Sequence, residues 1–389
     1  MKENWTYKKL GDVCQVVTGS TPKTNIPEYW SGKYPWITPA ELKGDTYIRD
    51  TERHITDKAV AHTNLTLMPI GTVLLSSRAP IGKVAITERE MYCNQGFKNL
   101  ICSDEINNKY LFLWLKGQTN YLNSLGRGAT FKEISKNIVE NIQIPLPPLS
   151  IQQSIVAELD EINNLLQLKK KELEIFDKLA QSIFYEMFGD PVTNEKGWEV
   201  KKLVNNVLEM FLGPFGSALK IDSYVPESES YAMVYEQKHA IQATLSLDNH
   251  YINEEKYNSL ERFEVKGGDF IMSCRGTIGK LYRVPMGSPR GIIHPSLMKI
   301  RIKEDAYDPI FFGFMLKKII ANQTTKGNCV QMAITAKELG NKLLPIPSLS
   351  LQQNFATRIE AIEQQKELVK ASINKLETLL ASRMQYWFD

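Results

Sequence analysis

Apolar residues return every three or four positions along two stretches, one after residue 150 and one after residue 350. The two stripes are Ile155, Leu159, Ile162, Leu166, Leu173, Phe176 and Ile183, and then Phe355, Ile359, Ile362, Val369, Ile373, Leu376 and Leu380. A mean spacing of about 3.5 residues is typical of a coiled-coil seam. The pattern predicts two helices, each about 57 Å long, that bury their stripes against each other. The alternative is two core helices, each packed on its own domain.

Both helices are expected to begin at a serine, Ser150 or Ser350, directly after a proline-rich segment. Serine is a good N-cap, and proline cannot continue a helix backwards. One lysine interrupts each stripe, Lys169 in the first and Lys366 in the second. We hypothesise that these two lysines help to fix the register of the helix pair.

The chain is a duplication. The segment Trp198–Leu203 repeats Trp5–Leu10, and Ser273–Lys280 repeats Ser76–Lys83. The predicted organisation is a first domain at 1–149, a first spacer helix at 150–189, a second domain at 190–349 and a second spacer helix at 350–389.

Between these anchors the two halves differ. The first half has a turn-rich loop, Thr18–Thr24, and an aromatic cluster, Tyr29–Trp36, for which no counterpart is obvious. The second half instead has Phe211–Ser217 and Tyr231–His239. Short apolar runs such as Gly71–Ser76 predict buried strands. A mixture of short strands and helices predicts an α+β domain in each half.

Length and composition narrow the class of protein. The chain has 389 residues, 43% of them apolar, which is enough for two or three domains with real cores. No apolar run is long enough for a transmembrane helix, and the N-terminus lacks the pattern of a secretory signal. The five cysteines are scattered, at Cys14, Cys93, Cys102, Cys274 and Cys329. We expect a cytoplasmic protein with reduced thiols and no contact with a membrane.

Familiar catalytic signatures are missing from the sequence. It has no phosphate-binding loop, dinucleotide-binding glycine motif, zinc-protease motif or nucleophile elbow. The five histidines lie far apart and are more often surface or satisfied polar residues than ligands. We therefore expect no catalytic residue and no metal site, and a binding or assembly protein rather than an enzyme.

Two repeated turns carry basic side chains, Arg78 and Lys83 on the first and Arg275 and Lys280 on the second. Arginine at the tip of a turn can pair with guanine or phosphate through two parallel hydrogen bonds. A solvated hairpin tip explains one copy better, and the repetition makes the two interpretations about even. The net charge of +3 says little by itself, but the excess lies in the two globular segments, with +4 at 1–149 and +2 at 190–349, which is compatible with contact to phosphate.

Glycine-rich loops provide the remaining candidates for DNA contact, since glycine lets backbone approach a ligand closely. Arg127 and Lys132 flank one such loop, and Lys326 and Gln331 occupy the matching place in the second half. Lys23 lies on the turn-rich loop of the first half. The aromatic cluster is better explained by packing than by stacking on bases.

Taken together, these motifs resemble the specificity subunit of type I restriction-modification enzymes. The resemblance covers essentially the whole chain. It rests on the repeated Trp-x-x-Lys-Lys-Leu, on Gly19–Lys23 with Pro35–Leu42, on Ser77–Val84, on Ile144–Leu149 with Gln152 and Gln153, and on Met187–Pro191. The second half departs more from the family pattern, with Gly276 and Thr277 where the first half has Ala79 and Pro80.

The resemblance implies two α+β target recognition domains, each reading one half of a split sequence in double-stranded DNA. The two long helices would form an antiparallel coiled coil that relates the halves as an internal pseudo-twofold repeat. They would also dock two methyltransferase subunits, which use S-adenosylmethionine, and restriction/translocase subunits, which use ATP and magnesium, would join them. This chain itself would bind no cofactor.

Two other classes of function stay open from the residues alone. One is a coiled-coil assembly scaffold that does not read DNA. The other is a methyltransferase in its own right, which would need a cofactor motif that the sequence lacks.

Overall fold

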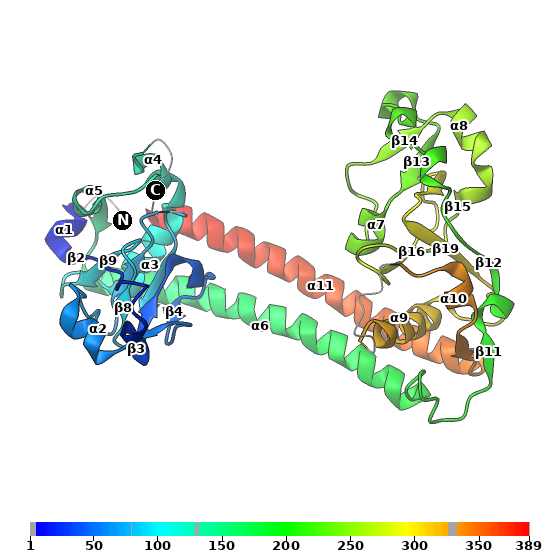
Figure 1. Ribbon diagram of the computed structural model, residues 1–389, viewed down its shortest axis with the longest axis horizontal. Helices are drawn as coiled ribbons and strands as arrows, with labels where there is room; N and C mark the ends of the chain where they lie inside the picture. The colour runs from blue at the N-terminus through cyan, green and yellow to red at the C-terminus, as the bar shows by residue number, and fades with distance from the viewer. Residues whose placement is uncertain (1–4, 79, 129–131, 326–332, 389) are drawn as a thin grey trace. The chain divides into compact units, whose positions relative to one another are not determined.

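The computed structural model describes residues 5–78, 80–128, 132–325 and 333–388. The chain divides into two compact units, Met1–Lys171 with Lys370–Asp389, and Glu172–Val369. Each unit contains one globular domain, part of helix α6 (Leu149–Phe188) and part of helix α11 (Leu349–Phe388) (Figure 1). Both long helices therefore contribute to both units.

The first unit is built on a five-stranded sheet with the order β2-β9-β6-β7-β4. These strands are β2 (Cys14–Thr18), β9 (Lys98–Cys102), β6 (Val73–Leu75), β7 (Val84–Thr87) and β4 (Tyr47–Ile48). A second sheet has the order β5 (His54–Ile55), β3 (Trp30–Ile37), β8 (Tyr92–Cys93), and β1 (Thr6–Lys9) pairs with β10 (Gln143–Leu146). The domain's helices are α1 (Leu10–Val13), α2 (Asp57–His62), α3 (Asn108–Gly117), α4 (Thr119–Leu125) and α5 (Lys136–Glu140). The main core joins the five-stranded sheet to α3 and to the start of α6.

The second unit has a four-stranded main sheet with the order β12-β19-β16-β17. These strands are β12 (Val207–Leu212), β19 (Leu297–Ile302), β16 (Phe270–Ser273) and β17 (Leu281–Arg283). The second sheet has the order β14 (His250–Ile252), β13 (Ala232–Tyr235), β18 (Gly291–Ile293), β15 (Glu264–Val265), and β11 (Val200–Lys202) pairs with β20 (Leu343–Pro345). The helices are α7 (Gln237–Gln242), α8 (Glu254–Ser259), α9 (Pro309–Thr325) and α10 (Ala336–Gly340). Short 3-10 turns occupy Pro27–Tyr29, Pro39–Glu41, Leu203–Asn206, Gly216–Ala218, Ile221–Ser223, Glu227–Glu229 and Glu261–Phe263.

The two units share a topology beyond the stretches that repeat in sequence. Strand β3 pairs antiparallel with β5 and parallel with β8, and β13 pairs antiparallel with β14 and parallel with β18. The expectation that Tyr29–Trp36 has no counterpart is therefore wrong, because Tyr231–His239 lies in the matching place. Different side chains on one strand frame hid the match. The predicted α+β class and internal repeat are confirmed.

A buried glutamine fixes the start of each long helix. The Gln152 side chain accepts a hydrogen bond from the Asn107 N–H at 2.8 Å and donates to the carbonyls of Glu105 (3.0 Å) and Pro147 (2.8 Å). Gln352 makes the same three bonds in the second unit, with Asp308, Ala306 and Pro347. Neither glutamine is exposed to solvent. The repeated Gln-Gln motif thus ties each helix to the loop before α3 or α9.

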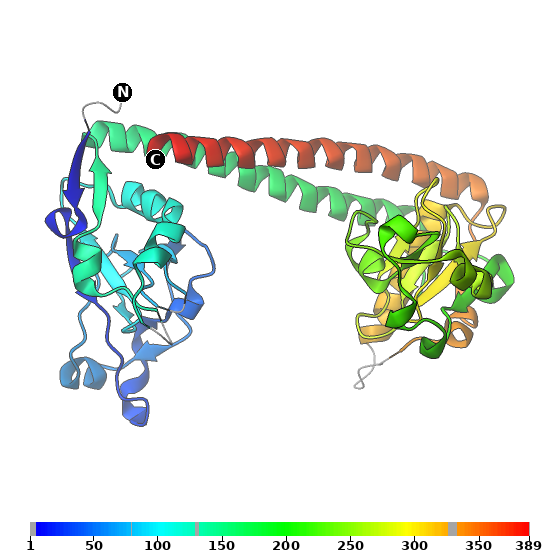
Figure 2. The same ribbon diagram turned by 90° about the horizontal axis from the view of Figure 1, so that it is seen from above.

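Within each unit the two long helices run antiparallel (Figure 2). In the first unit Glu158 pairs with Arg383, and Lys170 pairs with Glu377 at 3.0 Å, so the numbering of α6 rises as that of α11 falls. Trp387 Nε1 donates to Glu158 at 3.0 Å. In the second unit Lys366 of α11 lies 2.8 Å from Asp177 of α6.

All fourteen residues predicted for the seam are buried or half-buried. Ile155 and Leu159 belong to the core of the first domain, and Phe355 and Ile359 belong to that of the second. The stripes thus contact the facing helix and the adjoining domain, so each of the two alternative interpretations describes part of the packing. No helix in the described ranges is both long and apolar enough to cross a membrane.

Candidate nucleic-acid interface

The two basic turns have the same internal structure. Ser76 Oγ donates to the Pro80 carbonyl at 2.7 Å and accepts the Lys83 N–H at 2.8 Å. Ser273 Oγ likewise donates to the Thr277 carbonyl and accepts the Lys280 N–H at 2.9 Å. The turns align without a gap, so Arg275 occupies the position of Arg78, and Lys280 that of Lys83.

Arg78 lies beside the loop between β8 and β9. A Cβ on Gly96 would be 3.3 Å from Arg78 Nε, and the Ser77 N–H donates to the Gly96 carbonyl at 2.8 Å. On its other side, Ser77 accepts the Ile134 N–H at 2.9 Å. The guanidinium has no carboxylate partner within the described part of the chain, which leaves it available to a ligand.

The glycine-rich loop of the first unit is closed at its base by backbone bonds between Arg127 and Glu133, at 2.9 and 3.0 Å. The side chain of Lys98 is buried below it and donates to Glu133 at 3.1 Å and to Ser77 at 3.2 Å. This lysine therefore holds the glycine-rich loop against the basic turn. Arg127 and Lys132 are exposed on the loop, while Lys326 and Gln331 lie outside the described residues.

The turn-rich loop that carries Lys23 has a counterpart as well, contrary to expectation. Gly19 donates to the Phe97 carbonyl, and a Cβ there would lie 2.0 Å from the Asn94 oxygen. Gly213 donates to the Leu297 carbonyl, and its Cβ would lie 2.3 Å from a backbone oxygen of the matching loop. Only glycine fits at either place. Phe211–Ser217 thus takes the position of the first half's loop, on which Lys23 is exposed.

The aromatic cluster is packed, as its composition favoured. Trp36 is buried, its ring meets that of Trp30 edge-on, and the Arg53 guanidinium lies 3.7 Å from the Trp30 ring centre. These rings support β3 from within the domain.

Not all predicted basic residues come together. Lys83 lines a separate hollow with Lys43 and Lys116, on the side of α3. Arg78 instead faces the loop that contains Gly96. Lys83, and by the repeat Lys280, are thus placed beside a helix rather than among the loops around Arg78.

A family model described as type I restriction modification DNA specificity domain matches residues 2–175 and 229–378. The chain belongs to this family. It is 31% identical to the type I restriction enzyme MjaIX specificity subunit of Methanocaldococcus jannaschii, over 92% of this chain and 87% of that protein.

Solved specificity subunits share the fold. A chain from a study of complex assembly and conformational transition of the type I R-M system matches with a TM-score of 0.68, at 20% identity, over 99% of this chain and 98% of that one. The S subunit of the type I restriction-modification system of M. genitalium matches with a TM-score of 0.54, at 16% identity, over 99% and 96%.

In this specificity subunit the loops around Arg78 also hold polar side chains that were not among the candidates predicted from the sequence. Asn94 donates from Nδ2 to Thr21 Oγ1 at 2.9 Å, and the exposed Gln95 also bonds to Thr21. Asn94 lies near Arg78 because Gly19 packs closely against it, and this contact follows from the pairing of β2 with β9, which the sequence does not show.

The matching end of the second unit carries a cluster of acid, amide and imidazole groups. Glu236 accepts bonds from Lys238 at 2.8 Å and His250 at 2.9 Å, and Gln237 donates to the Arg275 carbonyl at 2.7 Å. Burial would raise the pKa of Glu236, but the bonds from Lys238 and His250 lower it below its ordinary value. Its carboxylate is therefore ionised near neutral pH.

Histidine side chains that are far apart in sequence meet in this cluster. Burial lowers the pKa of His294, and the nearby Arg275 adds to the shift, while Glu236 opposes it. Among the described residues, no group of His, Cys, Asp or Glu has the arrangement to hold a metal ion. The cluster offers hydrogen-bond donors and acceptors beside Arg275.

Proposed function

We propose that this specificity subunit recognises a bipartite target in duplex DNA, with one half-site read by each globular domain. The observation that carries the proposal is the duplicated loop end. Matching backbone contacts hold the loops beside Arg78 and Arg275, yet the side chains around the two arginines differ.

The difference in side chains favours two unlike half-sites. Thr21, Asn94 and Gln95 surround the first loop end, and their hydroxyl and amide groups can pair with base edges, as glutamine and asparagine do with adenine. At the second end Gln237 lies beside Arg275, and the Glu236 carboxylate is already bonded to Lys238 and His250. The donors and acceptors available to base edges therefore differ between the two ends.

In this proposal the chain supplies recognition and assembly, and its partners supply catalysis. Two methyltransferase subunits would use S-adenosylmethionine to methylate adenine, and restriction/translocase subunits would use ATP and magnesium. The likeness to a protein named as a type I restriction enzyme specificity subunit supports this division of roles. The chain itself would bind no cofactor and catalyse no reaction.

The test is co-expression with a methyltransferase subunit of the same type I system, followed by sequencing that detects methyladenine. We expect a split motif with two specified halves and a fixed gap. Exchanging the second domain for that of another specificity subunit should change one half only. A continuous motif, or a change in both halves, would contradict the proposal.

Salt dependence separates DNA reading from a pure scaffold. Contact with several phosphates makes DNA affinity fall steeply as salt rises, because bound counterions are released. We expect the assembled complex to lose about 10³-fold or more in affinity between about 50 and 200 mM salt. A complex that assembles but neither binds DNA nor methylates it would favour the scaffold instead.

A further inference from the structure

The main sheets of the two units differ by one strand. In the first unit β4 pairs in parallel with β7, with Tyr47 opposite Ile86. The Ile86 N–H donates to the Thr46 carbonyl at 2.8 Å, and the Glu88 N–H donates to the Ile48 carbonyl at 2.9 Å. The edge of β7 is thus covered by the chain's own backbone.

In the described part of the second unit, β17 ends the main sheet and no strand matches β4. The reason lies in chain length. The segment between α7 and β14 is Ala243–Asn249, which is shorter than the matching Leu42–Arg53 of the first unit. It connects the two elements without room for an added strand.

The free edge of β17 has a defined set of backbone groups. The Val284 N–H donates to Asp269 at 2.8 Å, and Lys280 accepts the Ser273 N–H at 2.9 Å, so both point toward β16. Strand alternation then directs the N–H and C=O groups of Leu281 and Arg283 outward. Arg283 pairs with Phe270, as Ile86 pairs with Val73 in the first unit. Arg283 therefore matches Ile86, the residue whose N–H binds the segment of β4. Among the described residues β17 pairs with β16 alone.

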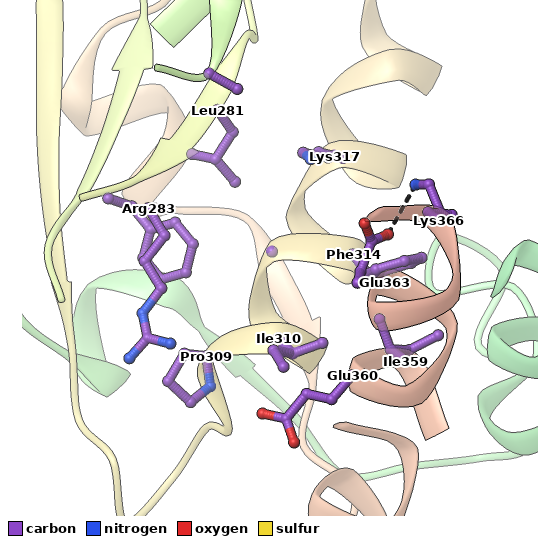
Figure 3. A pocket seen from close by; sticks show the side chains of 13 residues that line it. Leu281, Arg283, Pro309, Ile310, Phe314, Lys317, Ile359, Glu360, Glu363 and Lys366 are labelled. Carbon is purple, nitrogen blue, oxygen red and sulfur yellow. Dashed lines mark hydrogen bonds and ion pairs between the residues drawn. The ribbon is translucent and has the colours of Figure 1, made fainter. Parts of the chain in front are cut away.

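A cavity of about 600 Å³ adjoins this edge (Figure 3). Leu281 and Arg283 of β17 face Ile310 and Phe314 of α9 and Ile359 of α11 across it. Its floor is apolar, as expected for a site that receives an aliphatic or aromatic side chain.

The charges around the cavity indicate which kind of molecule it takes. Lys366 is already paired with Glu363 at 2.8 Å, whereas Arg283 and Lys317 have no ion-pair partner in the described ranges. Burial lowers the pKa of Lys317, and Glu363 opposes that shift. Arg283 is therefore the cation that favours an acidic group. The carboxylates of Glu360 and Glu363 also line the cavity and disfavour a DNA backbone, so a peptide fits better than nucleic acid.

We propose that the free edge of β17 and this cavity form a docking site for an extended segment of the methyltransferase subunit. The segment would add a fifth strand, as β4 does in the first unit, place an apolar side chain in the cavity and set an acidic residue near Arg283. Strand addition of this kind draws affinity from main-chain hydrogen bonds and specificity from pockets for alternate side chains. The inference rests on the proposed function for the identity of the partner.

Hydrogen–deuterium exchange on the full chain, alone and in complex with the methyltransferase subunit, tests the proposal directly. We expect the amides of Leu281 and Arg283 to exchange at least about tenfold more slowly in the complex, since each becomes hydrogen-bonded. The Ile86 amide, already bonded to β4, serves as the internal control and should not change. Unchanged exchange at Leu281 and Arg283 in an assembled complex overturns the proposal.

A matched pair of variants separates backbone from charge. Both Arg283→Pro and Arg283→Gln remove the cation, but only proline also removes the outward N–H, and it leaves the bonds to β16 in place. We expect Arg283→Pro to weaken assembly by about three- to tenfold more than Arg283→Gln, the effect of one net hydrogen bond. Equal affinities of the two variants would overturn strand addition.

The outcomes also separate this inference from the proposed function. If the wild-type complex methylates a split site while β17 stays unprotected, only the docking site fails. If the complex assembles and protects β17 but methylates no split site, the docking site stands and the proposed function fails. If the two proteins do not associate at all, both fail.

Discussion

His239 is held in its neutral form by its hydrogen-bond partners. Nδ1 accepts the Glu236 N–H at 2.8 Å, and Nε2 lies 2.7 Å from Asn249 Oδ1, so the proton belongs on Nε2. Burial lowers the pKa of His239, as does Lys238, while the Asn249 bond and Glu236 oppose the shift. If Nδ1 were protonated, its N–H would point at the Glu236 N–H, and two hydrogen-bond donors would face each other.

The second unit should therefore lose stability as the pH falls. An unfolded histidine takes up its proton near pH 6.5 at about its ordinary pKa, but folded His239 resists it. The unfolded state then binds more protons, so the free energy of unfolding declines from about pH 6.5 downward. The measurement is the urea midpoint of β13 hydrogen exchange between about pH 5 and pH 8.

The variant His239→Asn provides the control. Its amide oxygen can accept the Glu236 N–H, and it does not titrate. We expect a flatter pH profile, with a residual slope from His294, whose pKa is also lowered by burial. An unaltered slope in His239→Asn would rule out this histidine as the cause.

Each arginine of the basic turns should affect one half-site. Arg78→Ala should relax base preference in one half of the target, and Arg275→Ala in the other. A lost bidentate pair to guanine costs about 1–3 kcal/mol of discrimination, or about five- to 150-fold. Methyladenine sequencing of the two variants measures this.

The matched control for these arginines is Lys58→Ala. Lys58 is an exposed cation on α2 that is paired with Glu28. It should leave both halves of the motif intact. If Arg78→Ala and Arg275→Ala both relaxed base preference in the same half of the target, the hypothesis that each domain recognises one half-site would be refuted.

At the scale of residues, the sequence predicted the segments that occur in both halves with the same length and the same key residues. The turn at Ser76–Lys83 was visible because its second copy has the same length and the same serine, glycine and lysine. The pairing of Lys98 with Glu133, and of His250 with Glu236, was not visible. Such contacts depend on strand register and loop closure, which composition does not encode.

At the scale of elements, the start of each long helix depends on one glutamine. Gln152→Leu would remove the bonds to the Asn107 N–H and to two carbonyls, and would leave these backbone groups buried without partners. An unsatisfied buried group costs about 1–3 kcal/mol. We expect a loss of about 2–4 kcal/mol in the free energy of unfolding of the first unit, measured by hydrogen exchange in α3 and α6.

Two comparisons make this prediction specific. Gln352→Leu should destabilise the second unit by a similar amount and leave the first unchanged. Gln153→Leu, an exposed neighbour on the same helix, should change stability by less than about 0.5 kcal/mol. Equal effects of Gln152→Leu and Gln153→Leu would show that the buried bonds are not what matters.

The periodicity predicted the long helices to within one residue, since no other stretch of the chain has so long a stripe. The helices begin at Leu149 and Leu349, so Ser150 and Ser350 lie in the first turn and the prediction that they are N-caps is wrong. The second sheets were harder. Strands β3 and β13 pair with corresponding strands in the same directions, but their side chains differ. The loops between matched elements also differ in length. Because the offset between the halves varies, Gly19 and Gly213 could be aligned only from the structure, where Gly19 faces the Asn94 carbonyl and Gly213 faces the His294 carbonyl.

At the scale of the whole molecule, duplication has produced two units that share a frame and diverge at its edges. Because each domain has its own copy of the loops, the side chains around Arg78 and those around Arg275 can differ independently. It also leaves one main sheet with β4 and the other without it. The chain is therefore a pair of unlike units, and under the proposed function we expect them to contact their partners differently.

The lysines that interrupt the apolar stripes carry the last prediction. Lys366 of α11 lies 2.8 Å from Asp177 of α6 and from Glu363. Burial would lower the pKa of Lys366, but Asp177 and Glu363 raise it above its ordinary value, so the charge persists. A charged pair at one place in an apolar seam penalises any slipped register, in which the ammonium would be buried alone.

Replacing both Lys169 and Lys366 with leucine should thus keep the helices paired but weaken the choice of register. If the helix pair sets the gap between half-sites, the double variant will methylate targets whose gap differs by one base pair more readily than the wild type does. Lys178→Leu, which alters an exposed position of α6, is the control. An unchanged gap preference in the double variant would mean that apolar packing alone fixes the register, because the ion pair would then have no part in excluding the slipped arrangement.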